Sequence, residues 1–178
     1  MLKRRLAAAL LALATLAGIQ VVTTAPAFAA VRTLYYDSSQ AQEFVAVVDQ
    51  AASLWNTKVT SVRFVKVGAG QSANVRVYAD NGWPRTYTSS LGNGYWYMGR
   101  EAVDDGYYKL RIATHEFGHI LGLPDNRTGL CSDLMSGSSA PVSCTNANPS
   151  AAEAARVQRN FATGLVPATD GAEVVYIG

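Results

Sequence analysis

The residues with the clearest chemical potential lie in the segment His115-Glu116-Phe117-Gly118-His119. The two histidines are four positions apart, so on a helix they project from the same face. Two neutral imidazoles placed in this way can hold one Zn²⁺ ion, and Glu116 can reach a water on the metal without being a ligand itself. Its carboxylate can take a proton from that water as the water attacks a carbonyl. The string can also occur by chance on an ordinary helix, but here it contains both histidines of the chain.

A catalytic zinc site needs a third protein ligand and one open position. Because both histidines are already used, the third ligand must be Asp, Glu or Cys. Asp125 lies six residues after His119, and Gly122 lets the chain turn sharply between them. Such a turn can bring the Asp125 carboxylate back to the metal. The alternative for Asp125 is a solvated turn residue after Pro124.

The first 29 residues have the order of a secretory signal peptide, with cleavage expected after Ala29. A basic start at residues 3–5 precedes an apolar run over residues 6–19, and Ala27-Phe28-Ala29 has the small residues of a cleavage site. The alternative is a membrane anchor, but the run is short for a span of about 20 residues. We therefore expect a secreted, extracellular protein with no membrane attachment after cleavage.

Composition narrows the classes of partner. The chain has 15 basic and 13 acidic side chains, and the three basic residues 3–5 are lost with the signal, which leaves 12 against 13, or about −1. No basic patch remains, which argues against nucleic acid or an anionic membrane as the main partner. We expect a monomer with one domain over residues 30–162 and a tail over residues 163–178 whose structure the sequence leaves open.

Two cysteines, Cys131 and Cys144, fall in the exported part. An oxidising compartment favours a disulfide between them. The alternative is a pair of metal ligands, for which the residues between them offer no histidine and no third cysteine.

Several elements can be expected from periodicity. Strands are predicted at residues 31–36, 62–67 and 75–79, extended chain at 86–90, and a further strand at 95–98, which we expect at an edge of the sheet. Ser39 with Gln42 predicts a capping box that opens a helix ending near Asn56. Turns are expected at Asn81-Gly82 and at Asn93-Gly94.

The second half of the chain is expected to be mainly helix and loop. Residues 109–121 fit a helix that Gly122 ends, and residues 125–147 fit an ordered loop. Asn148-Pro149 opens a last helix with Ala155, Val157 and Phe161 facing inward, whereas residues 173–177 either pair as a strand or hang free. This order predicts an α+β domain in which a twisted mixed sheet packs against helices, with a cleft beside the edge strand.

The pattern His-Glu-x-x-His-x-x-Gly-x-x-Asp, here residues 115–125, is similar to that of the snapalysin family, the small neutral proteases among the metzincin-like zincins. The resemblance also covers residues 131–137 and 143–146 and the pair Trp55-Asn56, and it spans residues 31–162. It implies a zincin fold with an active-site helix, zinc bound by His115, His119 and Asp125, and Glu116 as the catalytic base.

The resemblance further implies that Met135 forms a Met-turn below the metal, held by a Cys131–Cys144 disulfide. It implies a preference for an aromatic residue just after the cleaved bond. Calcium is reported for the family, but the sequence shows no cluster of oxygen ligands to hold it. Metzincins with three histidine ligands often have a tyrosine just after the Met-turn methionine; Ser136 and Gly137 stand here, so the motif names no oxyanion stabiliser.

These observations predict a secreted zinc endopeptidase whose partners are protein or peptide substrates. We expect Tyr95, Trp96 and Tyr97 to form a wall on which a substrate lies as an added strand, the alternative being aromatic packing of a half-buried strand. Two other functions remain open. One is a non-catalytic secreted module with a structural zinc, and the other is a zinc amidase that acts on cell-wall peptides.

Overall fold

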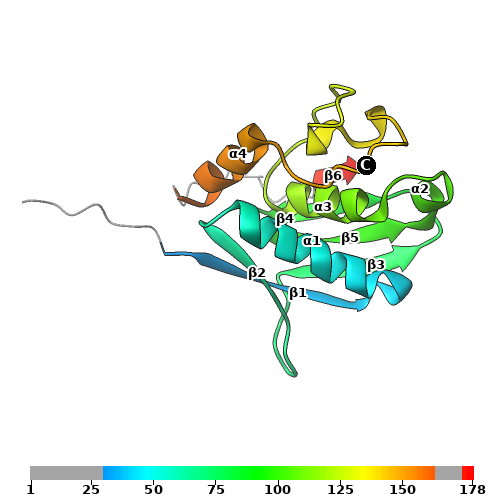
Figure 1. Cartoon of the computed structure of the whole chain (residues 1–178). Helices are drawn as coiled ribbons and strands as arrows, with labels where there is room; N and C mark the ends of the chain where they lie inside the picture. The colour runs from blue at the N-terminus through cyan, green and yellow to red at the C-terminus, as the bar shows by residue number, and fades with distance from the viewer. Residues whose placement is uncertain (1–29, 163–173) are drawn as a thin grey trace, which may run out of the picture.

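The computed structural model describes residues 30–162 and 174–178 (Figure 1). The predicted signal peptide at residues 1–29 and residues 163–173 of the predicted tail lie outside the described residues. Within the described part, none of the helices is long and apolar enough to cross a bilayer.

The first half of the described chain is a strand, a helix and then four consecutive strands, and the second half consists mainly of helices and loops. The strands are β1 (Arg32–Gln40), β2 (Val62–Lys66), β3 (Val75–Asp80), β4 (Arg85–Ser90), β5 (Asn93–Gly99) and β6 (Val174–Ile177). The α-helices are α1 (Val45–Lys58), α2 (Arg100–Asp104), α3 (Lys109–Ile120) and α4 (Ala151–Ala162), and the 3₁₀ helices are η1 (Gln42–Phe44) and η2 (Leu134–Ser139).

The strands form one mixed sheet in the order β2-β1-β3-β5-β4-β6. The pairs β1–β2, β1–β3 and β3–β5 are parallel, whereas β4 runs antiparallel to both β5 and β6. The helix α1 connects the parallel neighbours β1 and β2, as a crossover between parallel strands requires. The predicted α+β class with a mixed sheet is therefore confirmed.

The core lies between one face of the sheet and the helices α1 and α3, which pack against each other (Figure 1). Trp55 of α1 and Phe117 of α3 are fully buried in it, and the Trp55 indole donates a hydrogen bond to the Thr114 carbonyl at 2.9 Å. Every residue of α3 from Leu110 to Ile120 is buried. A helix buried on all sides cannot shift without disturbing the core, so it is a rigid platform for functional side chains.

The start of the first helix differs from the prediction. Ser39 lies inside β1, its backbone N–H is bonded to the Asp37 carboxylate at 2.9 Å, and Gln42 has a left-handed φ of 52°. The predicted capping box is therefore wrong, because the strand continues to Gln40 and the chain enters α1 through a 3₁₀ turn with no side-chain cap. The helix itself is present and runs two residues past Asn56.

The prediction of an edge strand at residues 95–98 is also wrong. Here β5 lies between β3 and β4, because β4 folds back on it through a turn at Leu91-Gly92. Gly92 has φ 83° and its N–H donates to the Ile120 carbonyl at 2.9 Å, so this turn is tied to the end of α3. The turn predicted at Asn93-Gly94 is instead the first part of β5.

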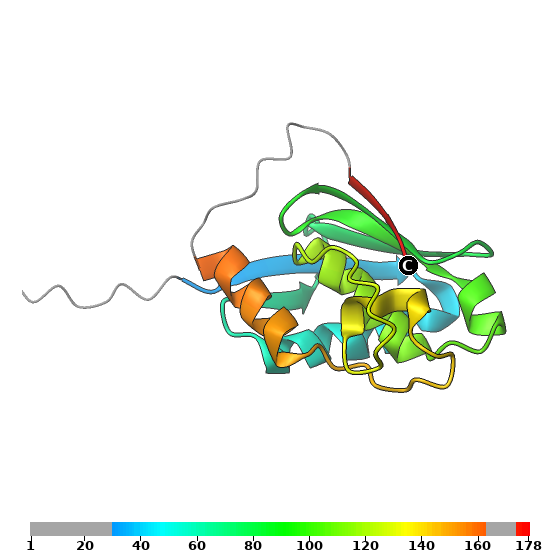
Figure 2. The same ribbon diagram turned by 90° about the horizontal axis from the view of Figure 1, so that it is seen from above.

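The last elements agree with the prediction in part. Val157 and Phe161 of α4 are buried, but Ala155 is exposed and the neighbouring Ala154 packs against the core instead. Of the two alternatives for residues 173–177, the described part of the segment pairs: β6 lies antiparallel along β4 at the edge of the sheet (Figure 2).

Candidate metal centre

His115 and His119 lie one turn apart on α3 with their Nε2 atoms 3.0 Å from each other. The other ring nitrogen of each is engaged by the backbone: His115 Nδ1 is 3.0 Å from the Leu134 carbonyl and His119 Nδ1 is 2.8 Å from the Leu123 carbonyl. A carbonyl can only accept, so each Nδ1 carries the proton and each Nε2 keeps its lone pair. Both imidazoles are therefore oriented as metal ligands.

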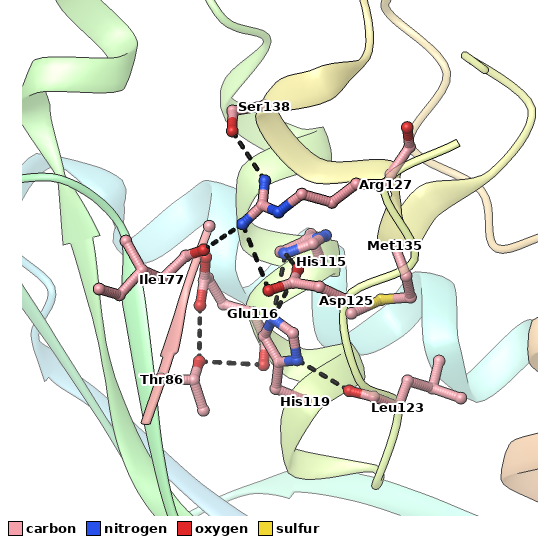
Figure 3. A network of polar contacts seen from close by, with 12 residues as sticks. Thr86, His115, Glu116, His119, Leu123, Asp125, Arg127, Met135, Ser138 and Ile177 are labelled. Carbon is pink, nitrogen blue, oxygen red and sulfur yellow. Dashed lines mark hydrogen bonds and ion pairs between the residues drawn. The ribbon is translucent and has the colours of Figure 1, made fainter. Parts of the chain in front are cut away.

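The chain returns to these imidazoles directly after α3. Gly122 takes a left-handed φ of 83°, and the Asn126 N–H donates to the Met135 carbonyl at 2.8 Å. Between these two points Asp125 is held with its Oδ1 atom 3.3 Å from His115 Nε2 and 3.6 Å from His119 Nε2 (Figure 3). The three side chains thus meet, although Asp125 belongs to a loop and not to the helix.

The donor set fits a zinc ion. Three ligand atoms at about 2.0–2.1 Å from a tetrahedral centre are roughly 3.3 Å apart. The observed separations of 3.0, 3.3 and 3.6 Å scatter around that value. Asp125 Oδ1 is buried and has no hydrogen-bond partner. A buried carboxylate oxygen without a partner is costly, and a cation at this point would satisfy it.

Met135 packs on α3 beside the two histidines (Figure 3). It is 1% exposed, and a Cβ at Gly118 would come within 2.7 Å of its sulfur. Only a glycine inside the His-Glu-x-x-His segment lets the methionine pack this closely on α3. The backbone N–H groups of Leu134 and Met135 donate to the Glu153 carboxylate, which ties the turn to α4.

The loop that carries Met135 is fixed by an arginine and a disulfide. Arg111, which is 5% exposed, donates to the backbone carbonyls of four residues, namely Cys131, Asp133, Leu134 and Asn146. Cys131 and Cys144 form the predicted disulfide. The Leu134 carbonyl that Arg111 contacts also accepts from His115, so the arginine supports an imidazole through one backbone group.

Glu116 is fully buried on the sheet side of the histidines. Its Oε2 accepts a hydrogen bond of 2.6 Å from the Thr86 hydroxyl, whereas its Oε1 has no partner (Figure 3). Burial raises the pKa of Glu116 to about 7, although His115 and Thr86 both act to lower it. A carboxyl group that titrates near neutrality is suited to accept a proton and release it again.

The two imidazoles differ in their electrostatics. Burial, together with the neighbouring His115, lowers the pKa of His119 to about 3. Burial also acts to lower the pKa of His115, but the carboxylates of Asp125 and Glu116 outweigh it, and the net shift is upward. Burial would raise the pKa of Asp125, yet the adjacent histidines and Arg127 hold it below its usual value. The Asp125 carboxylate is therefore favoured in its ionised form beside the two imidazoles.

The predicted aromatic wall does not line the metal centre. Trp96 is 0% exposed and packs on Phe117 with ring centroids 5.2 Å apart, inside the core. Tyr95 and Tyr97 point to the opposite face of the sheet, because neighbouring side chains of a strand alternate. There Tyr95 stacks on Tyr87, with centroids 4.8 Å apart. The alternative, aromatic packing within the sheet, describes all three residues.

Three residues at the site have no motif in the sequence. Thr86 of β4 donates a hydrogen bond to Glu116. Arg127 donates to Asp125 Oδ2 at 3.3 Å, to Ser138 Oγ at 2.9 Å and to the Ile177 carbonyl at 2.6 Å. Tyr176 of β6 stacks on His119, with ring centroids 4.1 Å apart. Their separation along the chain from residues 115–119 leaves no local spacing that could identify Thr86 or Tyr176. Arg127 follows Asp125 by two positions, which is its one local signal.

An apolar pocket opens beside Glu116. Its lining includes Trp83, Pro84, Ala102, Tyr107 and Ile112 together with His115 and Glu116. Tyr107 and Trp83 pack edge to face, with centroids 5.8 Å apart. The pocket therefore joins an aromatic cavity to the carboxylate of the candidate base.

Comparison with known proteins gives consistent results. The profile of the Streptomyces extracellular neutral proteinase (M7) family matches residues 30–164. The chain is 36% identical over 148 residues to the extracellular small neutral protease of Streptomyces lividans, covering 83% of this chain and 64% of that protein, so it spans less than two thirds of that relative. It is 39% identical over 133 residues to the extracellular small neutral protease of Streptomyces caespitosus, covering 74% of this chain and 98% of that protein.

Among solved structures, the chain is similar to High choriolytic enzyme 1, a hatching enzyme zinc-protease from the medaka fish Oryzias latipes. The match has a TM-score of 0.39 and 24% identity, and it covers 67% of this chain and 60% of that one. That likeness is too distant to add to the argument. The profile match and the identity to the S. caespitosus protein over nearly its whole length show that the chain belongs to the Streptomyces extracellular neutral proteinase (M7) family.

Proposed function

We propose that the chain is a secreted zinc-dependent endopeptidase in which His115, His119 and Asp125 hold the metal and Glu116 is the general base. One observation carries the proposal: three oriented donor atoms converge within 3.6 Å, beside a buried carboxylate that has one unpartnered oxygen. The names of the relatives, extracellular small neutral proteases, support both the proteolytic activity and the extracellular location.

Zinc bound by three protein ligands supplies Lewis acidity, because it lowers the pKa of a water in its open position and polarises a carbonyl. Glu116 Oε1 is then the proton acceptor for the attacking water. Thr86 fixes Oε2 at 2.6 Å, and Oε1 is left without a hydrogen-bond partner. The same carboxyl group passes the proton to the leaving amine, for which its pKa near neutrality is suited.

The substrate is a peptide in extended conformation. Without β6, β4 would be the edge of the sheet, and its backbone runs past Glu116 through Thr86. A peptide that pairs with β4 as an added strand passes over the metal centre. The apolar pocket lined by Trp83, Tyr107 and Ile112 then takes the side chain that follows the cleaved bond, which favours an aromatic residue at that position.

The test is hydrolysis of casein by the purified secreted protein. We expect one zinc per chain by elemental analysis, loss of hydrolysis on treatment with a strong chelator, and recovery when zinc is added. Glu116→Gln keeps the zinc but lowers kcat by about 10²–10⁴-fold, the usual contribution of a general base. The exposed Glu101 in the first turn of α2 provides the matched control, since Glu101→Gln leaves both zinc content and rate unchanged.

Two other outcomes have definite meanings. Hydrolysis that survives chelation, or a Glu116→Gln variant as active as the wild type, would contradict the mechanism. Stoichiometric zinc in a protein that hydrolyses neither casein nor peptidoglycan would indicate a structural metal. Release of peptides from peptidoglycan with no action on casein would assign the site to cell-wall amide bonds.

A further inference from the structure

The strand β6 lies over the metal centre and not at a remote edge of the sheet. It lies along β4 (Figure 2) and pairs with it antiparallel, in a register that sets Tyr176 opposite Thr86, the residue that holds Glu116. The family profile ends at residue 164, so β6 belongs to a part of the chain outside the family match. Its position therefore does not follow from family membership.

The contacts of β6 reach each part of the site. The Tyr176 ring stacks face to face on His119, with centroids 4.1 Å apart and planes 10° apart. The Ile177 carbonyl accepts from Arg127 Nη2 at 2.6 Å, and the same nitrogen lies 3.3 Å from Asp125 Oδ2 (Figure 3). One arginine thus joins the strand to a candidate metal ligand.

Gly178 follows β6 directly and lies next to Glu116, the candidate base. Its N–H donates to the Pro84 carbonyl at 3.0 Å, and its own carbonyl accepts from the Trp83 indole. A Cβ on Gly178 would come within 2.5 Å of Glu116 Oε1, the unpartnered oxygen. Gly178 also lines the apolar pocket next to the base. The backbone of the segment therefore fills the space where a scissile bond has to lie.

A substrate and this segment need the same backbone groups. The free edge of β4 has one row of N–H and C=O groups, and β6 already uses it. Building on the proposed endopeptidase function, we propose that residues 174–178 are an intramolecular inhibitor that occupies the substrate cleft and must leave it before a peptide can bind.

Few side chains of residues 174–178 hold the segment in the cleft, so we expect it to bind there reversibly. Only Val174 and Tyr176 face inward, whereas Val175 and Ile177 are 48% and 60% exposed. A segment tethered to its own site nevertheless competes at an effective concentration on the order of millimolar. Such a segment raises the KM for a substrate and leaves kcat unchanged, because saturating substrate displaces it.

The experiment compares two substitutions in the full zinc-loaded chain. Tyr176→Ser removes the stack on His119, and we expect a KM for a fluorogenic peptide lowered about tenfold with kcat unchanged, in line with the strength of an aromatic contact. Val175→Ser, on the exposed side of the same strand, is the matched control and leaves KM unchanged. A synthetic peptide of residues 174–178 added to the Tyr176→Ser protein inhibits it competitively, and the same peptide with serine for tyrosine does not.

The results separate this proposal from the function on which it rests. Equal KM values for the wild type and Tyr176→Ser, both with chelator-sensitive hydrolysis, would overturn the inhibitor and keep the endopeptidase. Absence of hydrolysis in all variants would overturn both. Intact mass spectrometry supplies the last check, since loss of the segment from the wild type but not from Glu116→Gln would identify it as a substrate of the site and not an inhibitor.

Discussion

The metal centre lies between two regions that are held in different ways. On one side are α3 and the loop with η2, where His119, Glu116 and Met135 are at most 1% exposed and the loop is tied down by Arg111 and a disulfide. On the other side is β6, four residues long, with alternate side chains in solvent. The first region is part of the core, whereas β6 is an edge strand that pairs with β4 alone. The two histidines and the candidate base are thus fixed by the core, whereas the proposed inhibitory segment is held by fewer buried side chains.

Removal of the loop ligand is expected to have the largest effect. Asp125→Ala leaves two imidazoles, so zinc affinity falls by more than about 100-fold, because loss of an outer partner alone typically costs 10–100-fold. Activity is lost with the metal. The matched control is Asp104→Ala in the exposed end of α2, which leaves zinc content unchanged. Zinc titration against a chelator of known affinity measures both, and equal affinities would remove Asp125 from the ligand set.

The buried arginine is expected to be the next most sensitive point on the rigid side. Arg111→Met removes four hydrogen bonds from a charged donor to backbone carbonyls, and the free energy of unfolding falls by about 3–5 kcal/mol, since a hydrogen bond to a charged group contributes about 1.5–3 kcal/mol. Denaturant unfolding gives the value. Arg63→Met at an exposed position of β2 is the control and changes stability by less than about 0.5 kcal/mol. A small effect at Arg111 would mean that the loop is held without it.

The disulfide is expected to contribute somewhat less. Replacing both Cys131 and Cys144 by Ala removes a constraint over a sequence separation of 13 residues, worth about 3 kcal/mol of unfolding free energy on the chain-entropy model. The wild type unfolded in reductant should match the double variant. If the two differ widely, the substitutions themselves, and not the lost crosslink, account for the change.

The smallest of these effects is expected at Thr86, which contacts Glu116 of α3 and lies in the strand that pairs with β6. Thr86→Val removes the hydroxyl that holds Glu116 Oε2, and one hydrogen bond to a charged group corresponds to a fall in kcat of about tenfold, with zinc content unchanged. Thr88 lies on the same face of β4 and its hydroxyl donates to the Val174 carbonyl, so Thr88→Val is the control for a general effect on the strand. A fall in zinc content or in stability without a fall in kcat would give Thr86 a structural role.

Part of this arrangement could be predicted because its cause is local. Helical geometry alone places His115 and His119 on one face, and a glycine at position 122 permits the left-handed φ that ends the helix. The alternation of Val75 and Val77 predicts a strand with one buried face, and both are buried in β3. The capping box at Ser39 failed because pairing of β1 with its neighbours extends the strand past that residue, and tertiary pairing outweighs a local propensity.

The sequence by itself determined the donor types, their helical spacing, the class of the fold and the pair of cysteines. Only the tertiary structure decided that Thr86 meets Glu116, that Tyr95 and Tyr97 turn away from the site, and that Tyr176 stacks on His119. The physical reason is the range of the interactions. Helix periodicity acts over one turn, whereas strand order depends on which backbone edges remain free after the whole sheet has formed, and no spacing along the chain records that choice.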